Sequence, residues 1–166
     1  MAYKKKNEPA VDEQDERQKE ESNKKKFALM IAARSICRKS YLKYVEITNT
    51  TMNEETDWKK GKHLVYLCDK VQEFIETKTG HAYDIMIISM PPQFGKSISV
   101  TETLPSWYIG KHPDDGVILV SYGDDLANRF GRRNKEKIAK FGKLIFDIDV
   151  SKEKSANDDF EIEKHR

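Results

Sequence analysis

The segment Met90–Ser97 (MPPQFGKS) holds the residues with the most specific chemistry in this sequence. Its last three residues, Gly95-Lys96-Ser97, match the G-K-[ST] ending of loops that bind a nucleoside triphosphate. In such loops the lysine reaches the β- and γ-phosphates, and the hydroxyl of the next residue ligates Mg²⁺. The sequence therefore predicts a site for ATP and Mg²⁺.

The predicted roles follow from this pattern. Lys96 would be the catalytic residue and Ser97 the metal ligand. Backbone N–H groups from Gln93 to Ile98 would surround the phosphates at the start of a helix, whose dipole favours negative charge. The predicted nucleotide-binding residues are Pro92, Gln93, Phe94, Gly95, Lys96, Ser97 and Ile98.

The loop departs from the general phosphate-loop pattern at its beginning. The position five residues before Gly95, where a glycine is expected, is Met90. Pro91 and Pro92 follow, and their rings make the loop stiffer than a glycine-rich one. The alternative is a Pro-Pro turn before an ordinary helix, with Lys96 in solvent. The apolar run Ile85–Met90, which predicts a buried strand leading into the loop, favours the nucleotide site.

Two helices are predicted before this strand. Apolar residues recur every three or four positions from Phe27 to about Val45 and again over Lys62–Lys78. The polar segment Thr48–Asn53 would connect the two helices. Further towards the N-terminus, residues 1–26 carry 8 Lys or Arg and 7 Asp or Glu. Such a segment buries too little apolar surface to fold, so it predicts a disordered charged arm.

The region after the loop predicts a β-α-β unit. A helix from Ser97 should end or kink at Pro105. The apolar run Val117–Tyr122 then predicts a second buried strand, parallel to the first. A further helix over Asp125–Phe141 is rich in Arg and Lys, which is typical of a solvated helix face or, less often, of a surface that follows nucleic-acid phosphates.

The domain organisation follows from these elements: a disordered arm (1–26), a helical subregion (27–80) and a phosphate-loop core (81–166). The predicted fold class is α/β, a partial P-loop NTPase (RecA-like) three-layer sandwich with parallel strands. Such ATPases also need an apolar strand that ends in carboxylates and holds Mg²⁺. The one candidate is Leu144–Asp149, and a loop or short edge segment is the favoured interpretation of it.

The remaining composition excludes several protein classes. Cys37 and Cys68 are isolated and lack metal-ligand spacing, so we expect buried thiols in a reducing compartment. No apolar stretch is long enough to span a bilayer, and the N-terminus does not resemble a signal peptide. The predicted location is the cytoplasm.

Three ordered motifs resemble one family, the large terminase subunits of phages and prophages. These are ATPases that package DNA into viral capsids. The loop is similar to their P-P-x-x-G-K-S. The segment Trp107–Pro113 is similar to the family's W-x-x-G-x-x-P. The segment Ser121–Arg132 is similar to its S-Y-[ST]-x-x-L-A-x-x-[FW]-[GS]-R. The resemblance extends over about Tyr41–Phe160, and its motifs are Pro91–Ser97, Trp107–Pro113 and Ser121–Arg132.

The resemblance implies the front part of an ATPase domain with a central parallel sheet. It also implies an RNase H-like nuclease domain further along, and double-stranded DNA, a small terminase subunit and a portal protein as partners. A homo-oligomeric ring would form only in the full-length protein. We expect the acidic strand and the nuclease to lie beyond Arg166, and therefore no sustained turnover by this chain alone. Many members carry an arginine where Gln93 stands, and glutamine supplies no positive charge.

Two other functions remain open from the residues. The chain could be a complete small P-loop ATPase or kinase-like enzyme that uses Asp147 or Asp149 as its magnesium carboxylate. It could instead be a non-catalytic interaction module, a prophage remnant whose helices bind a partner. Only the former predicts a loss of Mg²⁺-dependent binding when those carboxylates are removed. The latter predicts no stabilisation by nucleotide.

Overall fold

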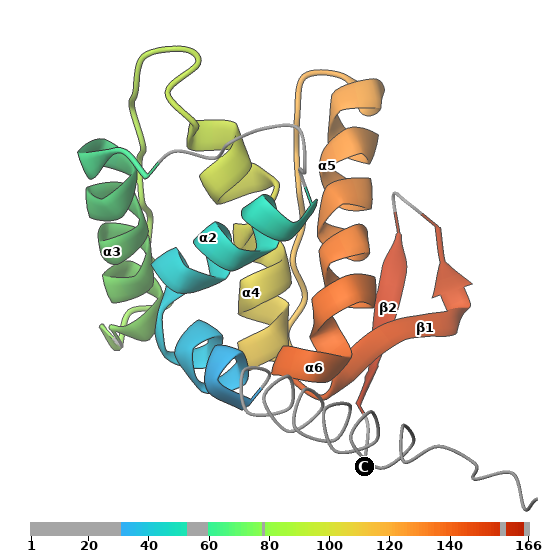
Figure 1. Cartoon of the computed structure of the whole chain (residues 1–166). Coiled ribbons are helices and arrows are strands. Elements are labelled where there is room, and N and C mark those ends of the chain that lie inside the picture. The colour runs from blue at the N-terminus through green and yellow to red at the C-terminus, as the bar shows by residue number, and fades with distance from the viewer. Residues whose placement is uncertain (1–30, 53–59, 78, 157–158, 165–166) are drawn as a thin grey trace, which may run out of the picture. The chain divides into compact units, whose positions relative to one another are not determined.

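The structure, a computed structural model, describes residues 31–52, 60–77, 79–156 and 159–164 (Figure 1). Residues Arg34–Arg166 form one compact unit. The predicted arm (1–26) and the beginning of the first predicted helix lie outside the described residues. The boundary predicted near residue 80 stays a prediction.

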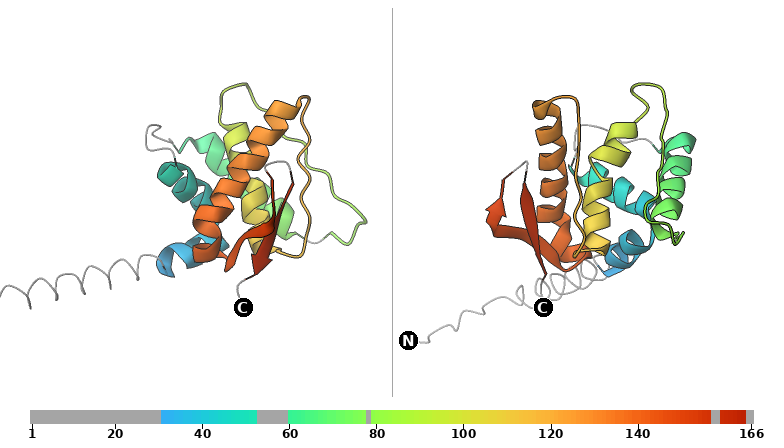
Figure 2. Two further views of the ribbon diagram at one scale, coloured as in Figure 1. Left: turned by 90° about the vertical axis from the view of Figure 1, so that its right-hand side faces the viewer. Right: turned by 180° about the vertical axis from the view of Figure 1, so that it is seen from behind.

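The described chain consists of helices followed by a β-hairpin. Residues 31–39 are helical, and a break at Ser40 precedes the first labelled helix. In Figures 1 and 2, α3 lies at one end of this arrangement and the hairpin at the other, with α4 and α5 between them. The elements are α2 (Tyr41–Met52), α3 (Lys62–Glu76), the π-helical turn η1 (Ser97–Thr101), α4 (Leu104–Lys111), α5 (Asp124–Lys137), the π-helical turn η2 (Ile138–Gly142), α6 (Lys143–Ile145), β1 (Ile148–Ser155) and β2 (Phe160–Lys164).

The fold is mixed α/β, but its sheet is not the predicted one. β1 and β2 pair in antiparallel register, with Val150 opposite Ile162 and an irregularity between Val150 and Ser155. The sequence does not predict this hairpin, because the favoured interpretation of Leu144–Asp149 is a loop or short edge segment. In the structure Leu144 lies in α6, and β1 begins at Ile148.

Neither predicted parallel strand has a ladder partner within the described residues. Ile85–Met90 and Val117–Tyr122 both run without a strand assignment, and the second passes alongside α5 (Figures 1 and 2). Each has a half-buried side, but Ile87 and Ile118 are both 88% exposed. Apolar composition indicates only that a segment can be buried. Whether the segment forms a β-strand depends on whether another segment lies beside it and pairs with its backbone. The parallel RecA-like sheet is therefore not part of the described structure.

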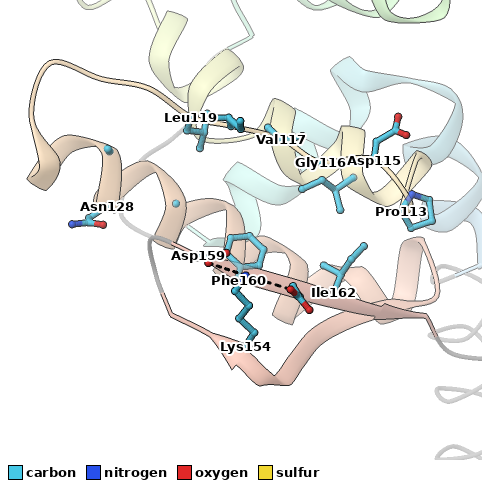
Figure 3. Close-up of a pocket in the computed structure, with 15 residues that line it drawn as sticks. Pro113, Asp115, Gly116, Val117, Leu119, Asn128, Lys154, Asp159, Phe160 and Ile162 are labelled. Carbon is cyan, nitrogen blue, oxygen red and sulfur yellow. Dashed lines mark hydrogen bonds and ion pairs between the residues drawn. The ribbon is translucent and has the colours of Figure 1, made fainter.

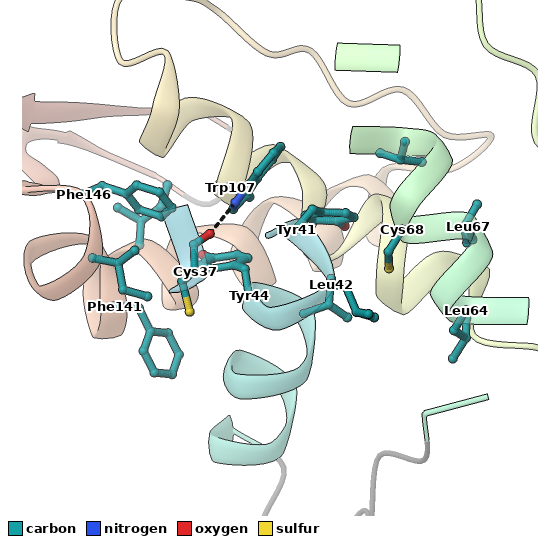
Figure 4. Packing of buried hydrophobic residues seen from close by; sticks show 14 of the residues in the cluster. Cys37, Tyr41, Leu42, Tyr44, Leu64, Leu67, Cys68, Trp107, Phe141 and Phe146 are labelled. Carbon is teal, nitrogen blue, oxygen red and sulfur yellow. Dashed lines mark hydrogen bonds between the residues drawn. The ribbon is translucent and has the colours of Figure 1, made fainter. Parts of the chain in front are cut away.

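A single core holds the helices together around Trp107 (Figure 4). The Trp107 indole is completely buried, lies 5.1 Å from the Tyr41 ring between centroids, and donates a hydrogen bond of 2.9 Å to the Cys37 carbonyl. The Tyr44 ring packs 5.6 Å from Phe146, which brings the C-terminal helical turns onto the same core. Residues separated by most of the chain thus share one apolar cluster.

Both cysteines are buried free thiols, as predicted. Burial raises the pKa of Cys37 to about 11. It also raises the pKa of Cys68 to about 12, with a smaller contribution from the Asp69 charge. These thiols are therefore protonated and unreactive at neutral pH.

The helix α2 continues beyond the predicted end near Val45 to Met52, and so includes most of the expected polar connector Thr48–Asn53. Thr48 and Asn49 are buried, and their side chains donate to the carbonyls of Tyr44 (2.7 Å) and Val45 (2.9 Å), four residues earlier. Asn49 also donates to the Thr103 hydroxyl at 3.4 Å. Polar side chains favour a loop when they have no hydrogen-bond partner within a helix. Here the helix itself satisfies the side chains.

Candidate nucleotide-binding site

The predicted phosphate loop is a tight backbone turn between the unpaired segment 85–90 and η1. Gln93 and Gly95 both adopt left-handed backbone conformations, with φ of 66° and 80°. Gly95 and Lys96 are half-buried, whereas the flanking residues Pro92, Gln93, Phe94, Ser97 and Ile98 are exposed. The seven predicted site residues therefore lie along this turn and the first two positions of η1, at the surface.

The Lys96 ammonium group has no ion pair or hydrogen bond with any residue that the structure describes. A half-buried cation without a protein partner is available to an anionic ligand. This is what a phosphate site requires. It also differs from the alternative of a fully solvated lysine, because Lys96 is not an exposed side chain.

A glycine is required at position 95 for two reasons. The left-handed φ of 80° is unfavourable for any residue with a Cβ atom, and a Cβ here would lie 3.1 Å from Cδ2 of Leu64. We expect Gly95→Ala to lower the stability of the loop by about 1–2 kcal/mol and to weaken binding of Mg-ATP. Isothermal titration with Mg-ATP measures the second effect.

Two further glycines provide matched controls for Gly95→Ala. Gly80 has a φ of 77° but no atom within 4 Å of its would-be Cβ, so Gly80→Ala reproduces the backbone strain without the Leu64 contact. Gly116 has open space and no left-handed φ, so Gly116→Ala should be neutral. Equal Mg-ATP affinity in the Gly95→Ala and Gly116→Ala proteins would contradict the importance of this turn.

Hydrogen bonds to the loop before it, to Thr103 after it and to α2 hold η1 in place. The Ser99 N–H donates to the Gly95 carbonyl at 3.0 Å, and the Thr103 hydroxyl donates to the Ile98 carbonyl at 2.7 Å. The Tyr41 hydroxyl of α2 donates to the Ser99 carbonyl from within the core. The start of η1 is thus attached to the buried part of the protein rather than left free.

The beginning of α3 contacts the loop from the other side, a contact that no sequence pattern predicts. His63 Nε2 lies 3.2 Å from the Phe94 carbonyl oxygen, and the two rings meet edge to face with centroids 5.5 Å apart. No local sequence pattern relates His63 to Phe94, because 31 residues separate them. Leu64, the next residue, packs against Gly95.

The carboxylates considered for magnesium are engaged elsewhere. Asp147 has a left-handed φ of 62° and is ion-paired with Arg34 and, at 3.6 Å, with Arg38. Asp149 accepts a hydrogen bond of 2.8 Å from the Val150 N–H. Within the described residues no group of three or more His, Cys, Asp or Glu side chains could hold a metal ion.

The basic helix α5 is partly neutralised by its neighbours. Arg129 lies 3.6 Å from Glu102, and Arg132 and Arg133 lie 3.8 and 3.6 Å from Glu136. Lys137 is almost completely buried, and desolvation lowers its pKa to about 8 against the opposing effect of Glu102. These pairings are typical of a solvated helix face. Contact of this helix with DNA, the less common explanation of its basic residues, stays a hypothesis.

A separate cavity of about 560 Å³ lies between the segment 113–119, α5 and β2 (Figure 3). Phe160 and Ile162 line it, and Lys154 at its edge is ion-paired with Asp159 at 2.8 Å and Glu161 at 3.3 Å. None of the loop residues Pro92–Ile98 contributes to its lining. Its one lysine is already neutralised, so the chemistry of a phosphate site belongs to the loop.

The family comparison matches the segment that contains this loop. Residues 87–164 match the family model of the terminase large subunit, T4likevirus-type, N-terminal. This match, over 78 of the 166 residues, supports the resemblance of the three motifs to phage large terminase subunits. Comparisons with curated proteins and with solved structures returned no match. The matched segment begins before the loop and ends in β2, so α2 and α3 lie outside it.

No helix within the described ranges is long and apolar enough to cross a membrane.

Proposed function

We propose that this chain is the ATP-binding N-terminal portion of a large terminase subunit, part of the motor that packages viral DNA into the procapsid. One observation carries the proposal: the segment that matches the terminase family contains a G-K-S turn whose lysine has no partner among the described residues. A phosphate loop acts by positioning and by neutralising charge, so a free cation beside a fixed backbone turn suits that function.

In this proposal the loop residues act as the sequence predicts. Lys96 neutralises the β- and γ-phosphates, and the exposed Ser97 hydroxyl ligates Mg²⁺. The backbone N–H groups from Gln93 to Ile98 hydrogen-bond to the phosphate oxygens. Because Gln93 supplies no positive charge, Lys96 is the sole cationic side chain of the turn itself.

The wider features of the family belong to the same proposal. The unpaired segments 85–90 and 117–122 would be strands of a RecA-like parallel sheet in the assembled ATPase domain. Double-stranded DNA, the small terminase subunit and the portal protein would be the partners, and a ring of copies the working assembly. The site of action would be the host cytoplasm.

Binding of Mg-ATP is the direct test. A fluorescent ATP analogue should bind the purified chain, be displaced by unlabelled ATP, and bind more weakly after EDTA removes Mg²⁺. A chain that binds the analogue equally well with and without Mg²⁺, or that shows no displacement by ATP, would contradict the proposed site. The non-catalytic interaction module predicts this second result.

Asp147→Asn separates the proposal from a complete small ATPase that uses this carboxylate for magnesium. Asparagine tolerates the left-handed backbone but removes the charge that pairs with Arg34 and Arg38. Since Asp147 is 43% exposed, we expect a loss of at most about 1 kcal/mol in stability. The Mg²⁺ dependence of ATP binding should be unchanged in titrations. Asp149→Asn serves as the companion variant, and loss of the Mg²⁺ dependence in either protein would favour the small ATPase.

A further inference from the structure

The peptide unit between Phe94 and Gly95 lies at the centre of the predicted phosphate loop, and one side chain outside the loop holds it. The Phe94 carbonyl oxygen lies 3.2 Å from His63 Nε2, on the first turn of α3. A carbonyl oxygen only accepts hydrogen bonds, so Nε2 is the donor and carries the proton. The contact therefore fixes the direction of the Phe94 C=O bond towards α3.

The orientation of this carbonyl determines the orientation of the Gly95 N–H. No peptide bond in the described residues is cis, and the C=O and N–H of a trans peptide point in opposite directions. The Gly95 N–H is therefore directed away from α3. It has no hydrogen-bond partner among the described residues, so it is a donor available to an anion.

A flip of this peptide would place a hydrogen-bond acceptor where the loop now presents a donor. Gly95 lacks a Cβ and can change φ at low cost, so glycine by itself does not prevent the flip. In the flipped state the Phe94 carbonyl would occupy the position of the donor, and its negative end would repel phosphate oxygens. A contact that holds the carbonyl on the α3 side favours the state that can bind an anion.

We propose that His63 is a positioning residue that locks the Phe94–Gly95 peptide in the orientation required for nucleotide binding. This inference rests on the proposed function and adds a residue from α3, outside the matched family segment, to the same site. The edge-to-face contact between the His63 and Phe94 rings restricts the imidazole further. Leu64 packs against Gly95 from the same turn, so α3 supports the loop at two adjacent positions.

Gly61 provides a second way to test the position of the His63 ring. A Cβ at position 61 would lie 2.5 Å from Cε1 of His63, far inside van der Waals contact. The backbone of Gly61 has φ −73° and ψ 148°, which any residue can adopt. Gly61→Ala should therefore displace the imidazole without straining the main chain, and it changes neither His63 nor the loop.

Three substitutions at position 63 separate the hydrogen bond from the ring contact. His63→Ala removes both, His63→Phe keeps an aromatic ring without a donor, and His63→Gln restores an N–H donor. Loss of one net hydrogen bond corresponds to about three- to tenfold in an equilibrium constant. We expect the Kd for Mg-ATP to rise about three- to tenfold in the alanine and phenylalanine variants and in Gly61→Ala. The glutamine variant should recover most of the affinity.

The measurement is isothermal titration with Mg-ATP, accompanied by thermal unfolding of each protein without ligand. His81→Ala is the matched control, because His81 is also an exposed histidine but pairs with Asp84 and not with the loop. Its affinity should equal that of the unchanged chain. The unfolding temperatures without ligand should remain close to one another, because the contact of His63 with Phe94 orients the loop and does not contribute to the core.

The outcomes distinguish this inference from the function on which it rests. If the unchanged chain binds no nucleotide, the proposed function fails and the inference with it. If the unchanged chain binds Mg-ATP and the His63→Phe variant binds it equally well, the proposed function stands and the positioning role of His63 is wrong. If His63→Gln does not recover the affinity for Mg-ATP, the positioning role is also wrong, because an N–H donor at position 63 is then not sufficient. If His63→Ala does not fold, the Phe and Gln variants and Gly61→Ala decide the question.

Discussion

Replacing Lys96 with alanine should abolish the stabilisation of this protein by Mg-ATP. A ligand present at 100 times its Kd raises the free energy of unfolding by about 2.7 kcal/mol, and this gain should be absent in the variant. The reason is that Lys96 is the one cationic side chain of the turn and has no partner among the described residues. Without it the loop retains only backbone donors against a highly charged triphosphate. Thermal unfolding with and without Mg-ATP measures the difference.

Lys143→Ala is the appropriate control for this experiment. Lys143 is an exposed lysine of α6 with no ion pair in the described part of the protein. Its removal changes the net charge by the same amount as Lys96→Ala, so a general electrostatic effect would appear in both proteins. Nucleotide stabilisation that survives in the Lys96→Ala protein would place the site somewhere other than this loop.

Trp107→Ala should be the most destabilising single substitution in the core. The indole is completely buried, donates to the Cys37 carbonyl, and packs against the Tyr41 ring and beneath the Lys111 ammonium group at 4.5 Å. Truncation of a buried tryptophan to alanine costs about 3–5 kcal/mol through lost burial and the cavity left behind. Urea unfolding followed by far-ultraviolet circular dichroism measures this, because the substitution itself removes a fluorophore.

Trp107→Phe divides that loss into its two causes. Phenylalanine keeps an aromatic ring in the core but leaves the Cys37 carbonyl without its donor. An unsatisfied buried acceptor costs about 1–3 kcal/mol, so this variant should lie between the parent and Trp107→Ala. A loss below about 1 kcal/mol in Trp107→Ala, far under the usual cost of such a truncation, would mean that the helices do not depend on this contact.

The local elements were predictable where the sequence carries a periodic signal. The helix predicted over Lys62–Lys78 appears as α3, Lys62–Glu76, and its apolar positions Leu64, Leu67, Cys68 and Val71 are buried. The break expected at Pro105 comes slightly earlier, because η1 ends at Thr101 and Pro105 lies in the first turn of α4, which begins at Leu104. Both signals are local, because helical spacing and the missing proline N–H act within one or two turns.

What could not be predicted depends on contacts between distant segments. The apolar runs at 85–90 and 117–122 indicated strands, but a strand exists only where another chain segment pairs with it. The hairpin of β1 and β2 has few large apolar residues, so its sequence resembled irregular polar chain. The turn around Gly95 was visible from the G-K-S spacing. The support from His63 was not, because nothing in the sequence relates position 63 to position 94.

The attachment of η1 and α4 to the helices before the loop has a consequence for how the protein folds. The Tyr41–Ser99 and Trp107–Cys37 hydrogen bonds span 58 and 70 residues, and the Arg34–Asp147 pair spans 113. Closing such long loops costs entropy before any contact compensates it, so folding rates fall as the separation of contacts grows. The phosphate loop should therefore acquire its shape late, in the cooperative step that joins the two halves of the chain. Ligand added during refolding should leave the folding rate unchanged and slow only unfolding.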